Sequence, residues 1–186
     1  MRVVFLNIDK KLDTIIEKDV KYVLITDDVN KLKKFENLDI KPIVALYNGS
    51  YVVDLEKNNV IIDIPIDEKS NKKIINYANS HNVNTLLKEK NNNIYEMKLL
   101  CDNYHRRLII PYMFKDKIPN VLVTVREKDI YITSKRASLI NAIDEIFEYL
   151  NVKNSYVDLE NIYIKVSNEW YYKDRLNWKG YELYEN

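Results

Sequence analysis

Three nearly continuous apolar runs constrain the fold of this chain more than any other feature of its sequence. They occupy residues 2–8 (RVVFLNI), 21–26 (KYVLIT) and 42–48 (PIVALYN). An uninterrupted apolar run of this length is typical of a strand that is covered on both faces, as in the sheet of an α/β protein. The first quarter of the chain therefore predicts three buried strands of one sheet.

The segment between the second and third runs predicts a helix. Asp27 or Asp28 can act as its N-cap, and Val29, Leu32 and Phe35 follow at helical spacing. A buried strand, a short helix and another buried strand form the unit that joins parallel strands by a right-handed crossover. We therefore expect the three runs to form a parallel sheet.

The rest of the sequence predicts a hairpin, then a small α+β piece, and then a return to α/β order. A strongly amphipathic helix is predicted over 134–152, with Ser134 as its N-cap. An interrupted and resumed core is typical of a domain that carries an inserted cap. The other predicted elements are the hairpin at 49–67, a helix at 67–82, strands at 83–89, 93–100, 106–114, 120–127 and 128–135, and short strands at 155–159 and 162–166.

Composition narrows the classes of protein and of partner. The chain has 186 residues, a net charge of +1 and a single cysteine, Cys101. A charge this small creates no general attraction for nucleic acid or anionic lipid, and one cysteine excludes an internal disulfide framework. No stretch approaches the ~20 apolar residues that cross a membrane. We expect a cytoplasmic protein without a nucleic-acid or membrane partner, and the sequence leaves its oligomeric state open.

Three segments have a distinctive order of strand, turn and helix: residues 46–67 (LYNGSYVVDLEKNNVIIDIPID), 74–83 (IINYANSHNV) and 130–152 (IYITSKRASLINAIDEIFEYLNV). They resemble the corresponding segments of Cof-type phosphatases, which belong to the haloacid dehalogenase (HAD) superfamily. The resemblance implies an α/β fold, in which a HAD-like Rossmannoid core with a mostly parallel sheet carries a small inserted α+β cap. It implies a core of residues 1–66 and 127–186 and a reduced cap of residues 67–126.

The resemblance also implies where an active site would lie, and the first family motif is altered. That motif is an Asp-x-Asp-Gly-Thr run in which the first Asp attacks phosphorus and the second is a general acid/base. Here the nucleophile position holds Asn7, and Asp9 holds the second position. An amide oxygen is a poor nucleophile, and Mg²⁺ prefers anionic oxygen ligands. We therefore expect Mg²⁺ binding to be weakened, with Asp9 catalytic only if activity remains.

The remaining motifs are partly retained. Thr26 matches the hydroxyl that binds the phosphate, and Lys135 matches the lysine that neutralises its charge. In the fourth motif Asp158 and Asn161 are kept, as a metal ligand and a ligand-binding residue, but the final acid is absent. In the family this site binds phosphorylated small molecules.

Two other clusters carry alternative interpretations. Arg106 and Arg107 precede a predicted strand of the cap and can contact a phosphate or nucleotide, although a solvated basic turn explains them as well. The tail over residues 168–186 interleaves aromatic with basic residues, including Trp170 and Trp178. Such a tail can pack on the core, form a surface for a protein partner, or stack on nucleic-acid bases, and packing is the commonest of these outcomes.

The sequence therefore favours a non-catalytic protein, a pseudophosphatase that binds a protein partner or sequesters a phosphorylated small molecule or nucleotide. A magnesium-dependent phosphohydrolase acting on a nucleotide or sugar phosphate is one alternative. A protein–protein interaction module that uses the aromatic tail is the other.

Overall fold

The computed structural model describes residues 2–8, 20–35, 40–113, 117–126, 129–151, 157–158 and 183–184. The chain divides into two compact units. The core unit comprises Met1–Asp63 and Leu139–Asn186, and the inserted unit comprises Ile64–Ser138. One continuous segment of sequence thus forms the inserted unit, whereas the core unit is assembled from two segments.

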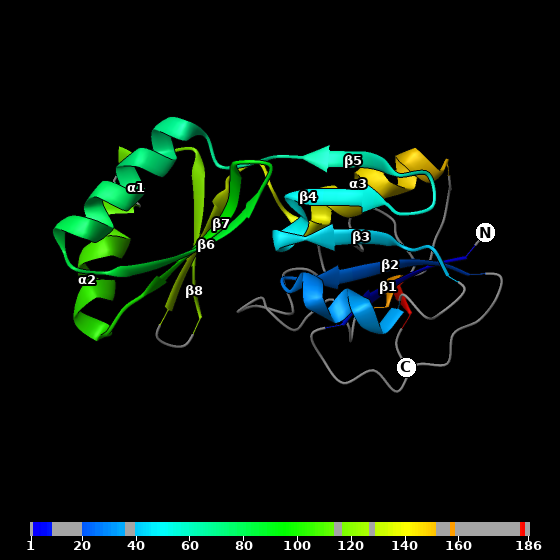
Figure 1. The fold of residues 1–186 in the computed structure, drawn as a ribbon, viewed down its shortest axis with the longest axis horizontal. Coiled ribbons are helices and arrows are strands. Elements are labelled where there is room, and N and C mark those ends of the chain that lie inside the picture. The colour runs from blue at the N-terminus through cyan, green and yellow to red at the C-terminus, as the bar shows by residue number, and fades with distance from the viewer. Residues whose placement is uncertain are drawn as a thin grey trace. The chain divides into compact units, whose positions relative to one another are not determined.

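The core unit is built on a five-stranded sheet in the order β1-β2-β3-β4-β5 (Figure 1). Strands β1, β2 and β3 are parallel to one another, and β4 and β5 continue the sheet as an antiparallel hairpin. The bounds are β1 Arg2–Asn7, β2 Val20–Thr26, η1 Val29–Phe35, β3 Ile43–Leu46, η2 Tyr47–Gly49, β4 Tyr51–Asp54, β5 Asn59–Asp63, α3 Leu139–Leu150, β10 Val157–Asp158 and β11 Leu183–Tyr184.

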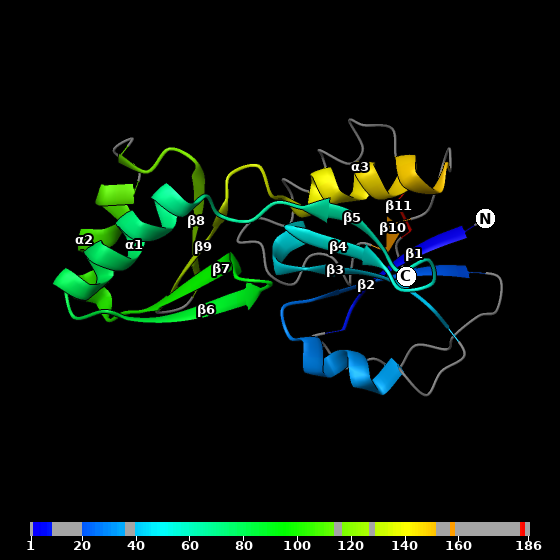
Figure 2. The same ribbon diagram turned by 45° about the horizontal axis from the view of Figure 1, so that its top comes forward.

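The apolar runs form these strands because both of their faces are covered (Figure 2). On one face, Tyr22 and Leu24 of β2 pack with Leu32 and Phe35 of the 3₁₀ helix η1. On the other, Phe5 of β1 meets Phe147 of α3 edge to face, with ring centroids 5.6 Å apart. The predicted parallel sheet and the predicted hairpin are both confirmed.

Helix η1 begins as the sequence predicts, and the structure selects one of the two candidate caps. The Asp28 carboxylate accepts a hydrogen bond from the backbone N–H of Asn30 at 3.0 Å. Helix α3 begins later than expected. Its first residue is Leu139, and Ser134 is the last residue of β9, so Ser134 is not its N-cap.

The inserted unit pairs a four-stranded antiparallel sheet with two helices. The strand order is β6-β7-β9-β8. Side chains from α1, α2 and one face of the sheet form a single core around Ile74, Met97, Ile109 and Ile130, each of them 0% exposed. The bounds are α1 Glu68–Ser80, β6 Asn84–Lys90, β7 Asn93–Leu100, α2 Asn103–Tyr112, β8 Val121–Arg126 and β9 Asp129–Ser134.

Two details of this unit differ from expectation. The strand predicted at 106–114 is helix α2, because Asp102 caps a helix there by accepting the backbone N–H of His105 at 2.9 Å. The expected cap ended at residue 126, whereas the compact unit continues to Ser138 because β9 pairs with both β7 and β8. Across the described residues, no helix is long and apolar enough to cross a membrane.

Candidate functional site

The parallel strands of the core unit end together at one edge of their sheet. Asn7, the last residue of β1, pairs with Ile25, and Thr26, the last residue of β2, pairs with Leu46 at the end of β3. The backbone N–H of Ile8 continues this ladder by donating to the Ile25 carbonyl at 3.0 Å. Ligands of open α/β sheets bind at this carboxyl edge. The backbone therefore brings Asn7 and Thr26 to the edge where a ligand site is expected.

Thr26 is buried, with 1% of its surface exposed. Its hydroxyl accepts a hydrogen bond from the backbone N–H of Asp28 at 3.0 Å and lies 3.2 Å from the Asp28 carbonyl, to which it donates. These contacts hold the loop after β2 in a tight turn and fix the position of the hydroxyl. The single proton of the hydroxyl is thus engaged with the Asp28 carbonyl, and an anion at this edge would compete with that carbonyl for it.

The turn after β3 adopts an unusual backbone conformation at the same edge. Tyr47, Asn48 and Gly49 have φ angles of 52°, 56° and 80°, all in the left-handed region. Glycine and asparagine tolerate this region, but a buried tyrosine costs about 1–2 kcal/mol there. The Asn48-Gly49 pair signals the turn in the sequence, whereas nothing local signals the strained Tyr47. Strain of this kind concentrates at functional sites.

The other predicted site residues fall in several places. Lys135 is exposed in the turn after β9, where its backbone N–H donates to the Asn120 carbonyl at 2.8 Å. Thr26 belongs to the core unit and Lys135 to the inserted unit, so their meeting in one pocket stays a prediction. Arg106 and Arg107 lie on α2, in its first two turns, where Arg106 donates to the side-chain oxygen of Asn103.

Of the residues predicted to act in the first and fourth motifs, the structure describes the backbone of Asn7 and Asp158 alone. β10, which contains Asp158, lies beside β1, which ends at Asn7. The side chains of Asn7 and Asp158, and all of Asp9 and Asn161, lie outside what is described. Of the aromatic tail, the structure describes the backbone of Leu183–Tyr184 alone. Within the described ranges no group of three or more His, Cys, Asp or Glu side chains is placed to hold a metal ion.

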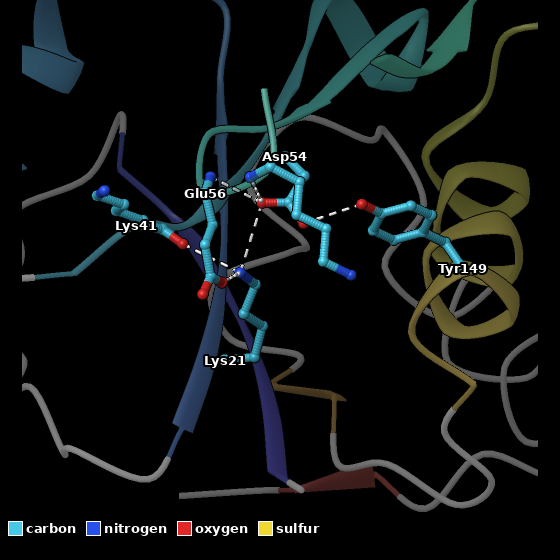
Figure 3. A network of polar contacts seen from close by, with 6 residues as sticks. Lys21, Lys41, Asp54, Glu56 and Tyr149 are labelled. Atoms are coloured by element: carbon cyan, nitrogen blue, oxygen red, sulfur yellow. Dashed lines mark hydrogen bonds and ion pairs between the residues drawn. The ribbon is translucent and has the colours of Figure 1, made fainter. Parts of the chain in front are cut away.

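A second polar cluster lies at the opposite end of the core sheet, near the first residues of β2 (Figure 3). The Lys21 ammonium group is 2.7 Å from a Glu56 oxygen, 3.5 Å from Asp54 Oδ1 and 3.1 Å from the Lys41 carbonyl. A cavity of about 380 Å³ opens beside it and includes Lys21 and Glu56 in its lining. Lys21 is therefore saturated with acceptors, and the cluster joins β2, the β4–β5 turn and the segment before β3.

Both the sequence and the fold of the chain resemble those of known proteins. The model of the haloacid dehalogenase-like hydrolase family matches residues 7–175. Among solved structures, a sugar phosphatase of HAD subclass IIB is 13% identical with a TM-score of 0.64, over 84% of this chain and 80% of that one. No curated protein matches the chain.

Two further structures have the same fold. A phosphatase of the haloalkanoate (HAD) superfamily from Bacteroides thetaiotaomicron is 14% identical with a TM-score of 0.65, over 88% of this chain and 79% of that one. A protein from Thermotoga maritima is 20% identical with a TM-score of 0.66, over 84% and 78%. At these identities the likeness shows the fold alone. The family match covers most of the chain, and on that basis the chain belongs to the haloacid dehalogenase-like hydrolase family.

Proposed function

We propose that this chain is a non-catalytic member of its family that holds a phosphorylated small molecule at the carboxyl edge of the core sheet. The observation that carries the proposal is the position of Asn7. It is the last residue of β1 and pairs with Ile25 of β2, the residue that precedes Thr26. In the resemblance to Cof-type phosphatases, this is the place of the attacking carboxylate.

The chemistry of an amide explains why binding is retained in the proposal while turnover is not. Attack on phosphorus needs an electron-rich oxygen that becomes a good leaving group in the second step, and a neutral Asn7 amide supplies neither property. Unaided hydrolysis of phosphate monoesters is so slow that enzymes accelerate it by up to ~10²¹-fold. Losing the nucleophile therefore abolishes turnover rather than tuning it.

The retained residues have roles that need no bond making. In the proposal the Thr26 hydroxyl turns its single proton from the Asp28 carbonyl to a phosphate oxygen when the ligand binds, and the Lys135 ammonium group neutralises the phosphate charge. Arg106 and Arg107 contact the rest of the ligand, and Asn161 adds a polar contact. Asp9 would be a general acid/base only in the alternative function, a phosphohydrolase of nucleotides or sugar phosphates.

Magnesium fits this donor set poorly. With Asn7 in place of a carboxylate, Asp9 and Asp158 are the acids that the altered motifs still offer. Mg²⁺ demands hard oxygen ligands in a strict octahedral arrangement, and each lost anion weakens its binding. The proposal therefore routes no step through a metal ion, and it predicts that ligand binding does not require one.

The test is a thermal-shift screen of the full chain against nucleotides and sugar phosphates, with and without Mg²⁺, with phosphate release measured in the same samples. A ligand at 100-fold above its Kd is expected to raise the Tm by roughly 5 °C or more. No phosphate release should accompany the rise. Magnesium-dependent release that disappears in Asp9→Ala would instead establish the phosphohydrolase.

Two single variants distinguish binding at a defined site from general attraction by positive charge. Lys135→Ala should abolish the rise in Tm, whereas Arg136→Ala, an equally exposed cation in the same turn, should leave it intact. Equal losses in both variants would show general charge attraction rather than a site. If no ligand in the panel shifts the Tm, the phosphate site is abandoned and a protein partner at the aromatic tail becomes the better hypothesis.

A further inference from the structure

Strand β8 forms one edge of the inserted unit's sheet. In the order β6-β7-β9-β8 it pairs with β9 on one side, and within the described part of the chain no strand pairs with its other side. An edge strand presents backbone N–H and C=O groups that are ready to pair with another strand. The outer edge of β8 can therefore accept a further strand.

The register identifies which backbone groups face outward. Val121 pairs with Ser134, and the Lys135 N–H donates to the Asn120 carbonyl at 2.8 Å. Because hydrogen-bonded pairs alternate along an antiparallel ladder, Leu122 and Thr124 direct their backbone groups toward β9. The N–H and C=O groups of Val121, Val123 and Val125 consequently point away from β9, along the free edge.

The two edges of this sheet are protected to different degrees. At the opposite edge, β6 carries a register irregularity between Lys88 and Glu89 and ends in the charged run Lys88-Glu89-Lys90. Bulges and charged side chains are the usual means by which proteins prevent edges from pairing. β8 pairs with β9 without any irregularity, and its sequence VLVTVR has no proline and no charge before Arg126. This edge is left open to pairing.

The side chains of β8 favour a partner that extends the same core. Val121, Val123 and Val125 pack against the core between the sheet and its two helices, where Val121 is 9% exposed and the other two are partly buried. Leu122 points to the other face and is 40% exposed. The apolar core thus reaches the edge of the sheet. An added strand with an apolar side chain at every second residue would extend that core.

From this edge we infer that β8 pairs antiparallel with β8 of a second copy of the chain, about a two-fold axis at Val123. Val121 then faces Val125 of the second copy, and the outward N–H and C=O groups of both strands bond reciprocally. The two helix layers lie on the same side of the joined sheet, so identical valines meet across the axis. This inference is independent of any ligand or activity.

A second copy is the occupant that this edge matches best. A two-fold interface brings each patch against itself, so the patch must be self-complementary. β8 meets that condition because its outward groups recur at every second residue on either side of Val123. An interface made mainly by one strand pair is small, and we expect a dissociation constant in the micromolar to millimolar range.

The first test is sedimentation velocity of the full chain across about 10 µM to about 1 mM, the range where such an affinity shows. The wild-type chain should shift from monomer to dimer as its concentration rises. Leu122→Lys places two cations near the axis and should weaken the dimer by at least tenfold. Leu86→Lys, at an even more exposed leucine (52%) on β6 of the same sheet, should leave it unchanged.

Cross-linking tests the register. Leu122 should face Thr124 of the second copy as a non-hydrogen-bonded pair, with Cα atoms ~4.5 Å apart, which suits a disulfide. The double variant Leu122→Cys/Thr124→Cys should therefore form covalent dimers on mild oxidation, and Leu86→Cys/Lys88→Cys should not. A chain that stays monomeric, or equal cross-linking in both double variants, would overturn the inference.

Discussion

Tyr149 of α3 donates a hydrogen bond of 3.1 Å to Oδ2 of Asp54, the last residue of β4, across 95 residues of sequence. Asp54 is 0% exposed, and its other oxygen accepts the backbone N–H groups of Glu56 at 2.9 Å and Lys57 at 3.4 Å. Its carboxylate also lies 3.5 Å from the Lys21 ammonium group. A buried charge is thus held by hydrogen bonds from two segments of the core unit.

Removing the Tyr149 hydroxyl should destabilise the core unit. Tyr149→Phe keeps the ring, over which the Lys57 ammonium group lies at 5.1 Å, and deletes only the bond to Asp54. Because the acceptor is charged and buried, we expect a loss of about 1.5–3 kcal/mol in the free energy of unfolding, measured by urea denaturation. Tyr104→Phe, at a tyrosine that is 65% exposed, should change it by less than about 0.5 kcal/mol.

The stability of the chain should depend on Asp54 at acid pH. Burial raises the pKa of Asp54, but the Glu56 N–H, the charge of Lys21, the Tyr149 hydroxyl and the Lys57 N–H outweigh it and hold that pKa below its ordinary value of 3.8. A depressed pKa contributes stability above the unfolded value, and this contribution is lost as the pH falls through the folded value. Unfolding free energies should therefore drop more steeply below about pH 4 in wild type than in Asp54→Asn. Identical pH profiles would contradict this role.

A stack of rings should stabilise the inserted unit. The centroid of the Tyr77 ring lies 4.2 Å from that of His81 and 4.1 Å from that of Tyr112. The Lys117 ammonium group lies 4.8 Å from the centroid of the Tyr112 ring. Tyr77→Ala removes both stacking contacts and should cost about 2–4 kcal/mol in chemical denaturation. Tyr77→Phe keeps the stack and loses only the bond to the Leu108 carbonyl, so its cost should be about 1 kcal/mol. Equal costs would show that the hydroxyl, not the stack, matters.

The N-cap of α2 can be tested by mutation, which checks that this segment is a helix and not the strand that the sequence pattern predicts. Asp102 accepts the His105 N–H, and this hydrogen bond holds the pKa of the Asp102 carboxyl below its ordinary value. Asp102→Ala should reduce the unfolding free energy by about 1 kcal/mol. Asp102→Asn should reduce it much less, because asparagine is also a good N-cap. A change below about 0.3 kcal/mol for the alanine variant would argue against a capped helix at this position.

Patterns in the sequence predict most strands because burial on both faces leaves an unmistakable apolar run, as in β1, β2 and β3. The run RRLIIPYMF, residues 106–114, is apolar as well, but its pattern does not identify the element. A short apolar run fits a buried strand or a buried helix equally well, and Ile109 and Met113 are in fact four residues apart on one helical face. Asp102, three residues before His105, is the local signal that distinguishes the two.

Prediction of the candidate site depends on different information. The Asn48-Gly49 turn and the ends of β1 and β2 follow from local patterns, so the carboxyl edge can be placed from sequence. The left-handed φ of Tyr47 cannot be predicted, because no local pattern signals it, and the contact between Tyr149 and Asp54 cannot, because the two residues are 95 positions apart. The sequence places Ser134 both in the strand at 128–135 and at the N-cap of the next helix, and its pairing with Val121, which is not visible locally, assigns it to the strand.

The split of the core unit into two segments has a consequence for synthesis on the ribosome. Ile64–Ser138 is one continuous piece of sequence, so every residue of the inserted unit is synthesised, and leaves the ribosome, before Leu139 does. The β1–β5 sheet must wait for α3, which supplies Phe147 against Phe5 and Tyr149 against Asp54. Because domains fold as they emerge, the inserted unit should complete first while one face of the core sheet stays uncovered. During translation, that uncovered face is the surface on which a nascent-chain chaperone would act.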